Sequence, residues 1–195
     1  MKNGFVKVAA TTPEIKVADC AYNGGQIIAQ ALKLAEEGCK LIAFPELCIT
    51  GYTCGDLFLQ EPLLRGAMEE LGHIASETKQ CDSLIVVGLP IMHIGRLYNV
   101  AAVIKAGQVL GLVPKSRIPN YSEFYEGRHF AYGEECRSTQ LLPFQQDPVP
   151  FQTRLLFACS NMPDFCLAVE ICEDLWMPIP PSSFHAMAGA TLIMQ

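Results

Sequence analysis

Charged residues are scarce in this sequence. Asp, Glu, Lys and Arg make up only 17% of its 195 residues, and half of the residues are hydrophobic. A typical soluble domain is about 25% charged, and a disordered chain is poor in apolar residues, so we predict one well-packed domain over residues 1–195. Basic residues do not exceed acidic ones, and the net charge of −6 excludes the basic surface that nucleic-acid binding requires.

Long apolar segments are also lacking. The longest uncharged apolar stretch, Leu84–Met92, is half as long as the ~20 residues that a membrane helix needs, and it contains Gly88 and Pro90. Lys7 and Glu14 interrupt any hydrophobic region near the N-terminus, so we expect neither a membrane span nor a secretory signal. The cysteine count, nine, is odd. We therefore predict reduced, mostly buried thiols in the cytoplasm rather than a disulfide framework.

Nucleotide-binding and metal-binding motifs are missing as well. The sequence has no Gly-x-x-x-x-Gly-Lys phosphate loop, no Gly-x-Gly-x-x-Gly fingerprint and no Cys-x-x-Cys pair. The four histidines have none of the spacings typical of zinc ligands. Cys48 and Cys54, six residues apart, are a weak candidate for a metal or redox pair. We expect no metal and no cofactor in this chain.

The hydrophobic pattern alternates strands with helices and then continues mainly as strands. We expect helices over residues 19–37, 61–79 and 183–188. Strands are expected over residues 5–10 (short and buried), 41–44, 84–89, 97–105, 108–113, 154–158, 165–171 and 191–194. Ala106-Gly107 is a predicted hairpin turn, and residues 119–150 are a predicted long loop. This mixture indicates a layered α/β domain. Because the last residues form an apolar strand, we expect a chain cut short at its C-terminus.

Three residues with reactive side chains lie just after the ends of predicted strands. Glu46 follows the strand over 41–44 through Pro45, Lys115 follows the strand over 108–113 through Pro114, and Cys172 follows the strand over 165–171. Ligand crevices in open α/β sheets lie at the carboxyl ends of strands. A carboxylate, an ammonium and a thiol are therefore expected to meet in one pocket. Taken singly, each has a plainer interpretation: a solvated group at a strand end, or an inert core thiol.

The three groups support a coherent reaction. Glu46 can take the proton from Cys172 as a general base. Lys115 can stabilise the thiolate and then a tetrahedral oxyanion, together with the backbone N–H of Glu173, each such donor contributing about 3 kcal/mol. Glu173 and Asp174 suit the first turn of a helix, whose dipole is expected to lower the pKa of the thiol.

The residues around these three positions strengthen the hypothesis. They form three ordered motifs: Phe44-Pro45-Glu46-Leu47 with Thr50-Gly51-Tyr52, then Pro114-Lys115-Ser116-Arg117-Ile118-Pro119-Asn120-Tyr121, then Glu170-Ile171-Cys172-Glu173-Asp174-Leu175-Trp176. Together they resemble the nitrilase (carbon–nitrogen hydrolase) superfamily, whose members use a Glu-Lys-Cys triad. The resemblance covers nearly the whole chain. The resemblance is strongest to the glutaminase domains of glutamine-dependent NAD synthetases. Its most distinctive part is the lysine motif together with residues 124–130, which follow it.

The resemblance implies a role for each matching residue. Glu46 matches the base, Lys115 the oxyanion stabiliser and Cys172 the nucleophile. The family also has a second glutamate that supports the lysine. Glu126 matches it best, and Glu123 is the competing candidate.

A further set of residues matches the substrate pocket of the glutamine-using members. Tyr52, Tyr121, Phe124 and Glu173 fall at these positions. Glu173 is placed to hold the α-ammonium group of glutamine by a charge-assisted hydrogen bond. For the two tyrosines, ordinary packing of aromatic loop residues is the alternative interpretation.

The resemblance also implies a fold and a biological role. The fold is a four-layer α-β-β-α sandwich larger than this chain, so its last elements and a following synthetase domain are expected to be missing. The implied activity is hydrolysis of L-glutamine, which supplies ammonia for ATP-dependent amidation of deamido-NAD to NAD. ATP and Mg²⁺ would bind the synthetase domain of the same polypeptide, and a homo-oligomer is expected. The alternatives are a stand-alone nitrilase-type amidase and a catalytically inactive interaction module, against which the intact triad argues.

Overall fold

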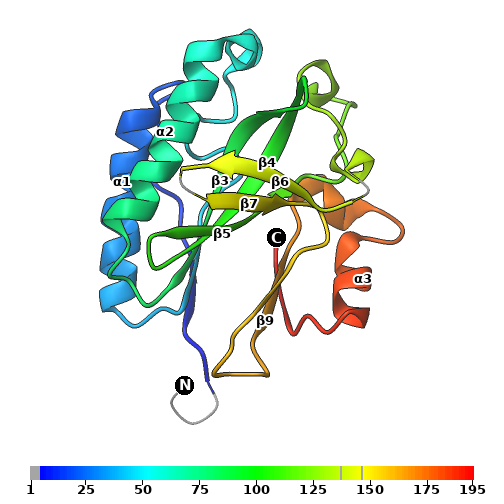
Figure 1. The fold of residues 1–195 in the computed structure, drawn as a ribbon. Helices are drawn as coiled ribbons and strands as arrows, with labels where there is room; N and C mark the ends of the chain where they lie inside the picture. Colours follow the sequence, from blue (N-terminus) through cyan, green and yellow to red (C-terminus); the bar gives the residue numbers. More distant parts are fainter. Residues whose placement is uncertain (1–4, 137, 146) are drawn as a thin grey trace.

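The computed structural model describes residues 5–136, 138–145 and 147–195, which form four layers. Helices α1 (Cys20–Glu36) and α2 (Glu61–Glu77) lie side by side on one face of a seven-stranded sheet. A three-stranded sheet packs on the other face, and the short helix α3 (Pro181–Met187) covers that smaller sheet from outside (Figure 1). The layered α/β prediction and the nitrilase-like arrangement of layers are therefore confirmed.

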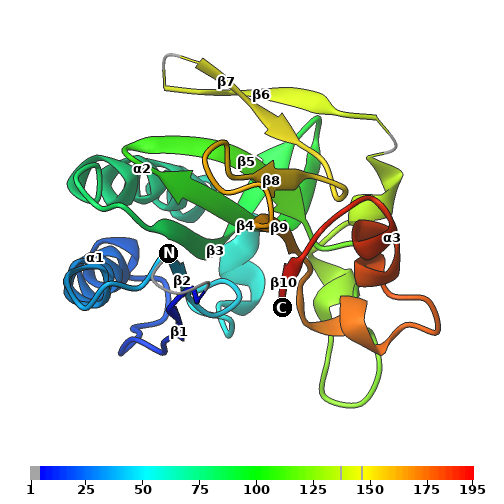
Figure 2. The same ribbon diagram turned by 90° about the horizontal axis from the view of Figure 1, so that it is seen from below.

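The large sheet has the strand order β1-β2-β3-β4-β5-β7-β6. Its strands are β1 (Val8–Ala10), β2 (Leu41–Ala43), β3 (Leu84–His93), β4 (Arg96–Lys105), β5 (Gln108–Pro114), β6 (Gln140–Phe144) and β7 (Asp147–Phe151). Strands β1, β2 and β3 are parallel, whereas β3, β4 and β5 form an antiparallel meander. As a result β2 and β5 run in the same direction, and their carboxyl ends lie at the same edge of the sheet. Figure 2 shows the β6–β7 hairpin extending the sheet beyond β5.

The small sheet consists of β8 (Leu156–Ala158), β9 (Cys166–Val169) and β10 (Leu192–Met194), in the order β10-β9-β8. Its buried side chains meet those of the large sheet in one core, and helices α1 and α2 meet the large sheet in a second core. In β3, Val86 belongs to the first core, and Ile85 and Val87 belong to the second. Because both faces of this strand are covered, its sequence is a continuous apolar run.

Local signals at the element ends agree with the predictions. Helix α1 begins after Asp19, whose carboxylate accepts a hydrogen bond from the Tyr22 N–H at 3.1 Å, as N-cap residues do. Gly38, with φ +86°, follows its end. In the β4–β5 hairpin, Ala106 and Gly107 have φ values of +50° and +84°, the left-handed pair that a type I′ turn requires.

The strand predicted over 84–89 is longer in the structure, because β3 continues to His93. Two other predicted segments differ in kind. Residues 5–10 were expected to form a buried strand, but only Val8–Ala10 form one, and Val8 is 50% exposed because β1 is the sheet edge. The predicted loop over 119–150 holds the 3₁₀ helices η2 (Glu126–Arg128) and η3 (Gly133–Glu135), and then the β6–β7 hairpin. The hairpin was not predicted because the segment contains prolines, which are rare in strands. They are tolerated because β6 is an edge strand and β7 pairs with β5 at one position only.

All nine cysteines are free thiols, as predicted. Most of them are buried, as predicted, and only Cys159 and Cys172 are partly exposed. No helix among the described residues combines the length and the apolar character that a bilayer crossing requires.

Candidate active site

The three chemically promising residues meet at one edge of the sandwich. Glu46 lies in the turn that follows β2, and Lys115 comes directly after β5. These two strands are parallel in direction within the large sheet, which brings both side chains to the same edge. Cys172 follows β9 of the small sheet and begins the 3₁₀ helix η4 (Cys172–Trp176). The site therefore lies where the two sheets end together.

The ammonium group of Lys115 is the centre of the site. Lys115 is only 1% exposed. Its Nζ donates hydrogen bonds to Glu46 Oε1 at 2.7 Å and to the two carboxylate oxygens of Glu126 at 2.9 and 3.0 Å. Burial disfavours the charged form, but the two carboxylates outweigh it and raise the pKa of Lys115. The lysine therefore stays charged in the protein interior. Glu126 is buried at this position, whereas Glu123 is exposed on the loop.

Asn99 of β4 also belongs to this network, although it was not among the predicted site residues. Its backbone carbonyl accepts the Lys115 N–H at 2.8 Å, and its Nδ2 donates to Glu46 Oε1 at 2.5 Å. Glu46 Oε1 therefore accepts hydrogen bonds from both Asn99 and Lys115, and Oε2 is left for proton transfer. A buried amide in an otherwise apolar strand needs a polar partner, and this signal was available in the sequence.

The backbone at Cys172 is left-handed, with φ +48°. Such a conformation is uncommon for a residue other than glycine and concentrates at functional sites. The thiol is partly exposed and lines a cavity of about 270 Å³ together with Glu46 and Asn99. A sharp turn after a strand is a common way to present a nucleophile.

The pKa of the Cys172 thiol differs from the prediction. Burial raises it, the charge of Glu46 raises it further, and Lys115 opposes them with a smaller effect. The predicted lowering by a helix dipole was wrong, because η4 is only five residues long and the buried, acidic surroundings dominate. Cys172 is therefore a protonated thiol at neutral pH and needs a base to become a nucleophile.

The predicted substrate-binding residues form two groups. The Tyr121 hydroxyl donates to Glu173 Oε2 at 2.8 Å, and the Phe124 ring packs edge-on against Tyr121 with 5.8 Å between ring centroids. The Tyr52 hydroxyl instead donates to Glu126 Oε1 at 2.9 Å. Tyr121, Phe124 and Glu173 thus lie together, whereas Tyr52 joins the carboxylates around Lys115.

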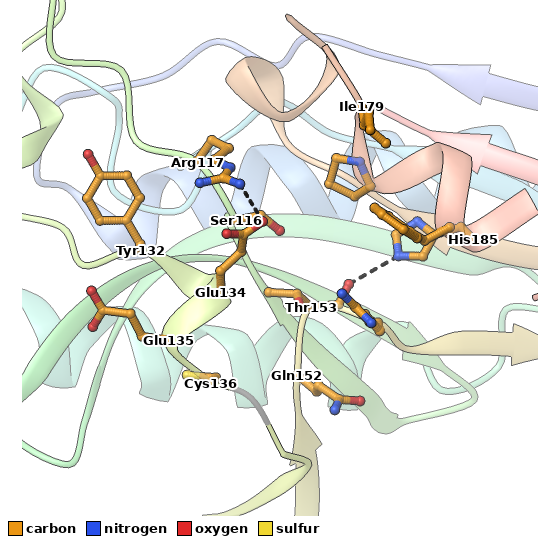
Figure 3. Close-up of a pocket in the computed structure, with 13 residues that line it drawn as sticks. Ser116, Arg117, Tyr132, Glu134, Glu135, Cys136, Gln152, Thr153, Ile179 and His185 are labelled. Carbon is orange, nitrogen blue, oxygen red and sulfur yellow. Dashed lines mark hydrogen bonds and ion pairs between the residues drawn. The ribbon is translucent and has the colours of Figure 1, made fainter. Parts of the chain in front are cut away.

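A larger cavity of about 920 Å³ lies beyond the Lys115 segment and contains none of the three central residues (Figure 3). Arg117 forms an ion pair with Glu134 at 2.8 Å on its wall, and the His185 ring bonds to the Thr153 carbonyl at 3.2 Å. Burial lowers the pKa of His185. Size therefore does not identify the active site, because Cys172 and Glu46 line the smaller cavity and the Lys115 ammonium bonds to Glu46.

Metal-ligand geometry is not found in the part of the chain that the structure describes, where no cluster of three His, Cys, Asp or Glu side chains could hold an ion. Cys48 and Cys54 bond separately to backbone groups: Cys48 Sγ accepts the Gly88 N–H at 3.3 Å, and Cys54 Sγ donates to the Thr50 carbonyl at 3.2 Å. Both thiols are free and buried, and each bonds to backbone groups rather than to the other.

Known proteins resemble this chain over nearly its whole length. The glutamine-dependent NAD(+) synthetase of Mycobacterium tuberculosis is 43% identical over 192 residues, which are 98% of this chain and 28% of that protein. A crystal structure of a glutamine-dependent NAD(+) synthetase from Cytophaga hutchinsonii matches with a TM-score of 0.82 and 28% identity, over 96% of this chain and 30% of that one.

An amidase from Nesterenkonia sp. shares the fold, with a TM-score of 0.71 and 20% identity over 99% of this chain and 65% of that one. The chain spans 28% of the length of the mycobacterial relative. The model of the family named Carbon-nitrogen hydrolase matches residues 7–195. Sequence and fold agree, and the chain belongs to the carbon–nitrogen hydrolase family.

Proposed function

We propose that this chain is a glutaminase that hydrolyses the side-chain amide of L-glutamine through a γ-glutamyl thioester on Cys172. The observation that carries this proposal is the buried ammonium of Lys115, held between Glu46 and Glu126 beside the cavity that Cys172 lines. The relatives are glutamine-dependent NAD(+) synthetases, which supports glutamine as the substrate.

In the first half-reaction, Glu46 Oε2 takes the proton of the Cys172 thiol, and the sulfur attacks the amide carbonyl carbon. The carbonyl electrons move to the oxygen, where the Lys115 ammonium and the Glu173 backbone N–H stabilise the negative charge. Glu46 then gives its proton to the amide nitrogen. The C–N bond breaks, ammonia leaves and the thioester remains.

In the second half-reaction, water replaces ammonia in the cavity. Glu46 takes a proton from this water while its oxygen attacks the thioester carbon, and Lys115 again stabilises the oxyanion. The C–S bond then breaks, glutamate leaves and the proton returns to the sulfur. Lys115 keeps its charge throughout, because the two neighbouring carboxylates raise its pKa.

The wider role that we propose is ammonia supply. The relatives are NAD synthetases more than three times as long as the part that this chain matches. Ammonia from glutamine would amidate deamido-NAD to NAD in a synthetase domain of the same polypeptide, which binds ATP and Mg²⁺, in the cytoplasm. Self-association belongs to the same proposal, and the large apolar side chains exposed in and after η4 support it: Leu175, Trp176 and Ile179, followed by Phe184 and Met187.

A diazoketone analogue of L-glutamine is expected to label Cys172 and no other cysteine. Seven of the other eight thiols are buried, and Cys172 lines the cavity. Peptide mass spectrometry of the full-length protein identifies the modified residue. Excess L-glutamine should protect it, and Cys172→Ala should give no adduct. Labelling that glutamine does not slow would point to another amide as the substrate, and no labelling at all would favour an inactive interaction module.

Glu173→Gln is expected to raise the KM for L-glutamine by about ten- to a hundredfold, because a charge-assisted hydrogen bond to the α-ammonium contributes about 1.5–3 kcal/mol. The buried Glu173 carboxylate already accepts a bond from the Tyr121 hydroxyl. Ammonia release measures KM and kcat. Glutaramate, which lacks the α-ammonium group, is the matched substrate. An equal effect of the substitution on both amides would contradict this role of Glu173.

A further inference from the structure

Asp174 is a buried carboxylate that binds only backbone groups. It is 1% exposed. Its Oδ1 accepts the Arg117 N–H at 2.7 Å, and its Oδ2 accepts the N–H groups of Ser116 at 3.2 Å and of Ile171 at 3.0 Å. One side chain thus satisfies three buried donors, which a carboxylate with two acceptor oxygens can do.

The three donors come from the two segments that carry the reaction. Ser116 and Arg117 directly follow Lys115, where the chain leaves β5 of the large sheet, and Ile171 directly precedes Cys172, where the chain leaves β9 of the small sheet. No strand of one sheet pairs with a strand of the other among the described residues. Asp174 therefore forms a polar bridge between the two sheets at the point where their catalytic residues face each other.

We propose that Asp174 is a positioning residue that fixes the Cys172 thiol relative to the Lys115 ammonium. Asp174 touches neither the substrate nor the reacting atoms and acts through the backbones of its neighbours. The inference uses the reacting pair of the proposed function, but it does not depend on which amide is the substrate.

Two observations explain why a charged group is kept in this buried place. The left-handed backbone at Cys172 is strained by about 1–3 kcal/mol, and the bond to the Ile171 N–H secures the residue immediately before it. Burial raises the pKa of Asp174 to about 6, and the three backbone bonds oppose this by favouring the carboxylate that accepts them. An asparagine has a single acceptor oxygen and cannot replace both carboxylate oxygens.

The test is Asp174→Asn in the full-length protein, with Glu70→Gln as the matched control. Glu70 is also a buried carboxylate, but it lies in α2, on the opposite face of the large sheet, and bonds to His73. The rate at which iodoacetamide alkylates Cys172 is followed against pH by peptide mass spectrometry. Steady-state kcat and KM are measured per folded molecule, with the folded fraction taken from urea unfolding, so that misfolded molecules do not count.

Asp174→Asn is expected to slow alkylation at neutral pH about tenfold, with the midpoint about one pH unit higher, because the Lys115 charge that lowers the thiol pKa is no longer held in place. The value of kcat per site should fall about tenfold or more, with KM within about twofold. Glu70→Gln should change neither the alkylation profile nor kcat. Asp174→Glu keeps the charge but moves the oxygens, so it should shift the alkylation profile and kcat in the same direction as Asp174→Asn. It is the second variant if Asp174→Asn does not fold.

A normal alkylation profile and a normal kcat per site in a folded Asp174 variant would overturn the proposal, even if the variant unfolds more easily. Absence of glutamine hydrolysis in the unmodified protein would instead contradict the proposed function. The alkylation comparison would still test Asp174 in that case, so the two failures are distinguishable.

Discussion

Replacing Lys115 by methionine is expected to lower kcat for amide hydrolysis about a thousandfold, the effect of removing an oxyanion donor from an active site. Methionine fills nearly the same space without the charge. Lys115 is the cation that bonds to Glu46 and Glu126, and its side chain is fully enclosed. Neither water nor a surface residue can take its place at the oxyanion.

The same substitution also disturbs the buried carboxylates. Burial and the charge of Glu46 raise the pKa of Glu126, and Lys115 opposes them. Without the ammonium this opposition is lost, so the pKa of Glu126 rises further and its protonated form is favoured. Glu46 also loses the Lys115 hydrogen bond that holds its Oε1. Loss of the oxyanion donor and a less well held base therefore act together.

Stability should fall too, by about 3–5 kcal/mol, because breaking a buried ion pair leaves an uncompensated charge. The loss depends on pH. Carboxyls whose folded-state pKa is raised bind more protons in the folded state than in the unfolded state, so the destabilisation is largest at high pH and shrinks as pH falls. Urea unfolding at pH 5 and pH 8 measures this difference, and ammonia release measures kcat.

The matched control is Lys105→Met. Lys105 pairs with the exposed Asp82 at 2.6 Å, and a surface pair contributes about 1 kcal/mol or less. Lys105→Met should therefore leave the amide-hydrolysis activity unchanged. The double variant Lys115→Met/Glu126→Gln should regain much of the stability but none of the activity. The assignment of Lys115 is wrong if Lys115→Met keeps a tenth of the activity or loses no more stability than Lys105→Met.

The meeting of Glu46 and Lys115 was predictable because strand direction is encoded in the connections. β2 is parallel to β3, and β3 and β5 point the same way across the antiparallel meander, so residues after the carboxyl ends of β2 and β5 share an edge. Cys172 comes from the second sheet. Its approach to the pair was predicted from its place at a strand end, and the family resemblance strengthened that prediction. Glu126 was chosen by motif, since nothing in an eleven-residue separation requires a loop to fold back onto Lys115.

The unpredicted features depend on tertiary contacts that leave no periodic trace in the sequence. Asp174 was expected only to lie in the first turn of a helix, but two of its three partners are backbone N–H groups of a segment 57–58 residues away. The raised pKa of Cys172 depends on how deeply the folded chain encloses it. Helix boundaries, in contrast, depend on neighbouring residues such as Asp19 and Gly38, and these were predicted within two residues.

Gly88→Ala is expected to impair both stability and catalysis, although it removes no functional group. Gly88 lies in β3 against the turn that carries the base. A Cβ at this position would lie 2.3 Å from the Leu47 nitrogen, 2.9 Å from the Glu46 carbonyl carbon and 3.0 Å from the Glu46 Cα. All three are backbone atoms, so no side-chain rotation relieves the clash. The turn has little freedom to adjust, because Leu47 is already left-handed with φ +53°.

The turn is also hydrogen-bonded to Gly88 itself. The Ile49 N–H donates to the Gly88 carbonyl at 3.1 Å, and the Gly88 N–H donates to Cys48 Sγ at 3.3 Å. Relief of the clash must therefore break these bonds or move the backbone of Glu46. Overpacking of this kind destabilises by about 1–3 kcal/mol, and a displacement of about 1 Å at a catalytic group lowers kcat about a hundredfold.

Gly25→Ala is the matched control, because Gly25 lies in helix α1 with no atom within 4 Å of an added Cβ. Alanine in a helix is favoured over glycine by about 0.5–1 kcal/mol, so this variant should be slightly stabilised and fully active. Urea unfolding and kcat separate the two cases, and equal behaviour of the two variants would contradict the role of Gly88. In the sequence, Gly88 only interrupts an apolar stretch. In the structure, the absence of a side chain at Gly88 makes room for the turn that carries Glu46 to pack against β3. The position of the base therefore depends on glycine at this position.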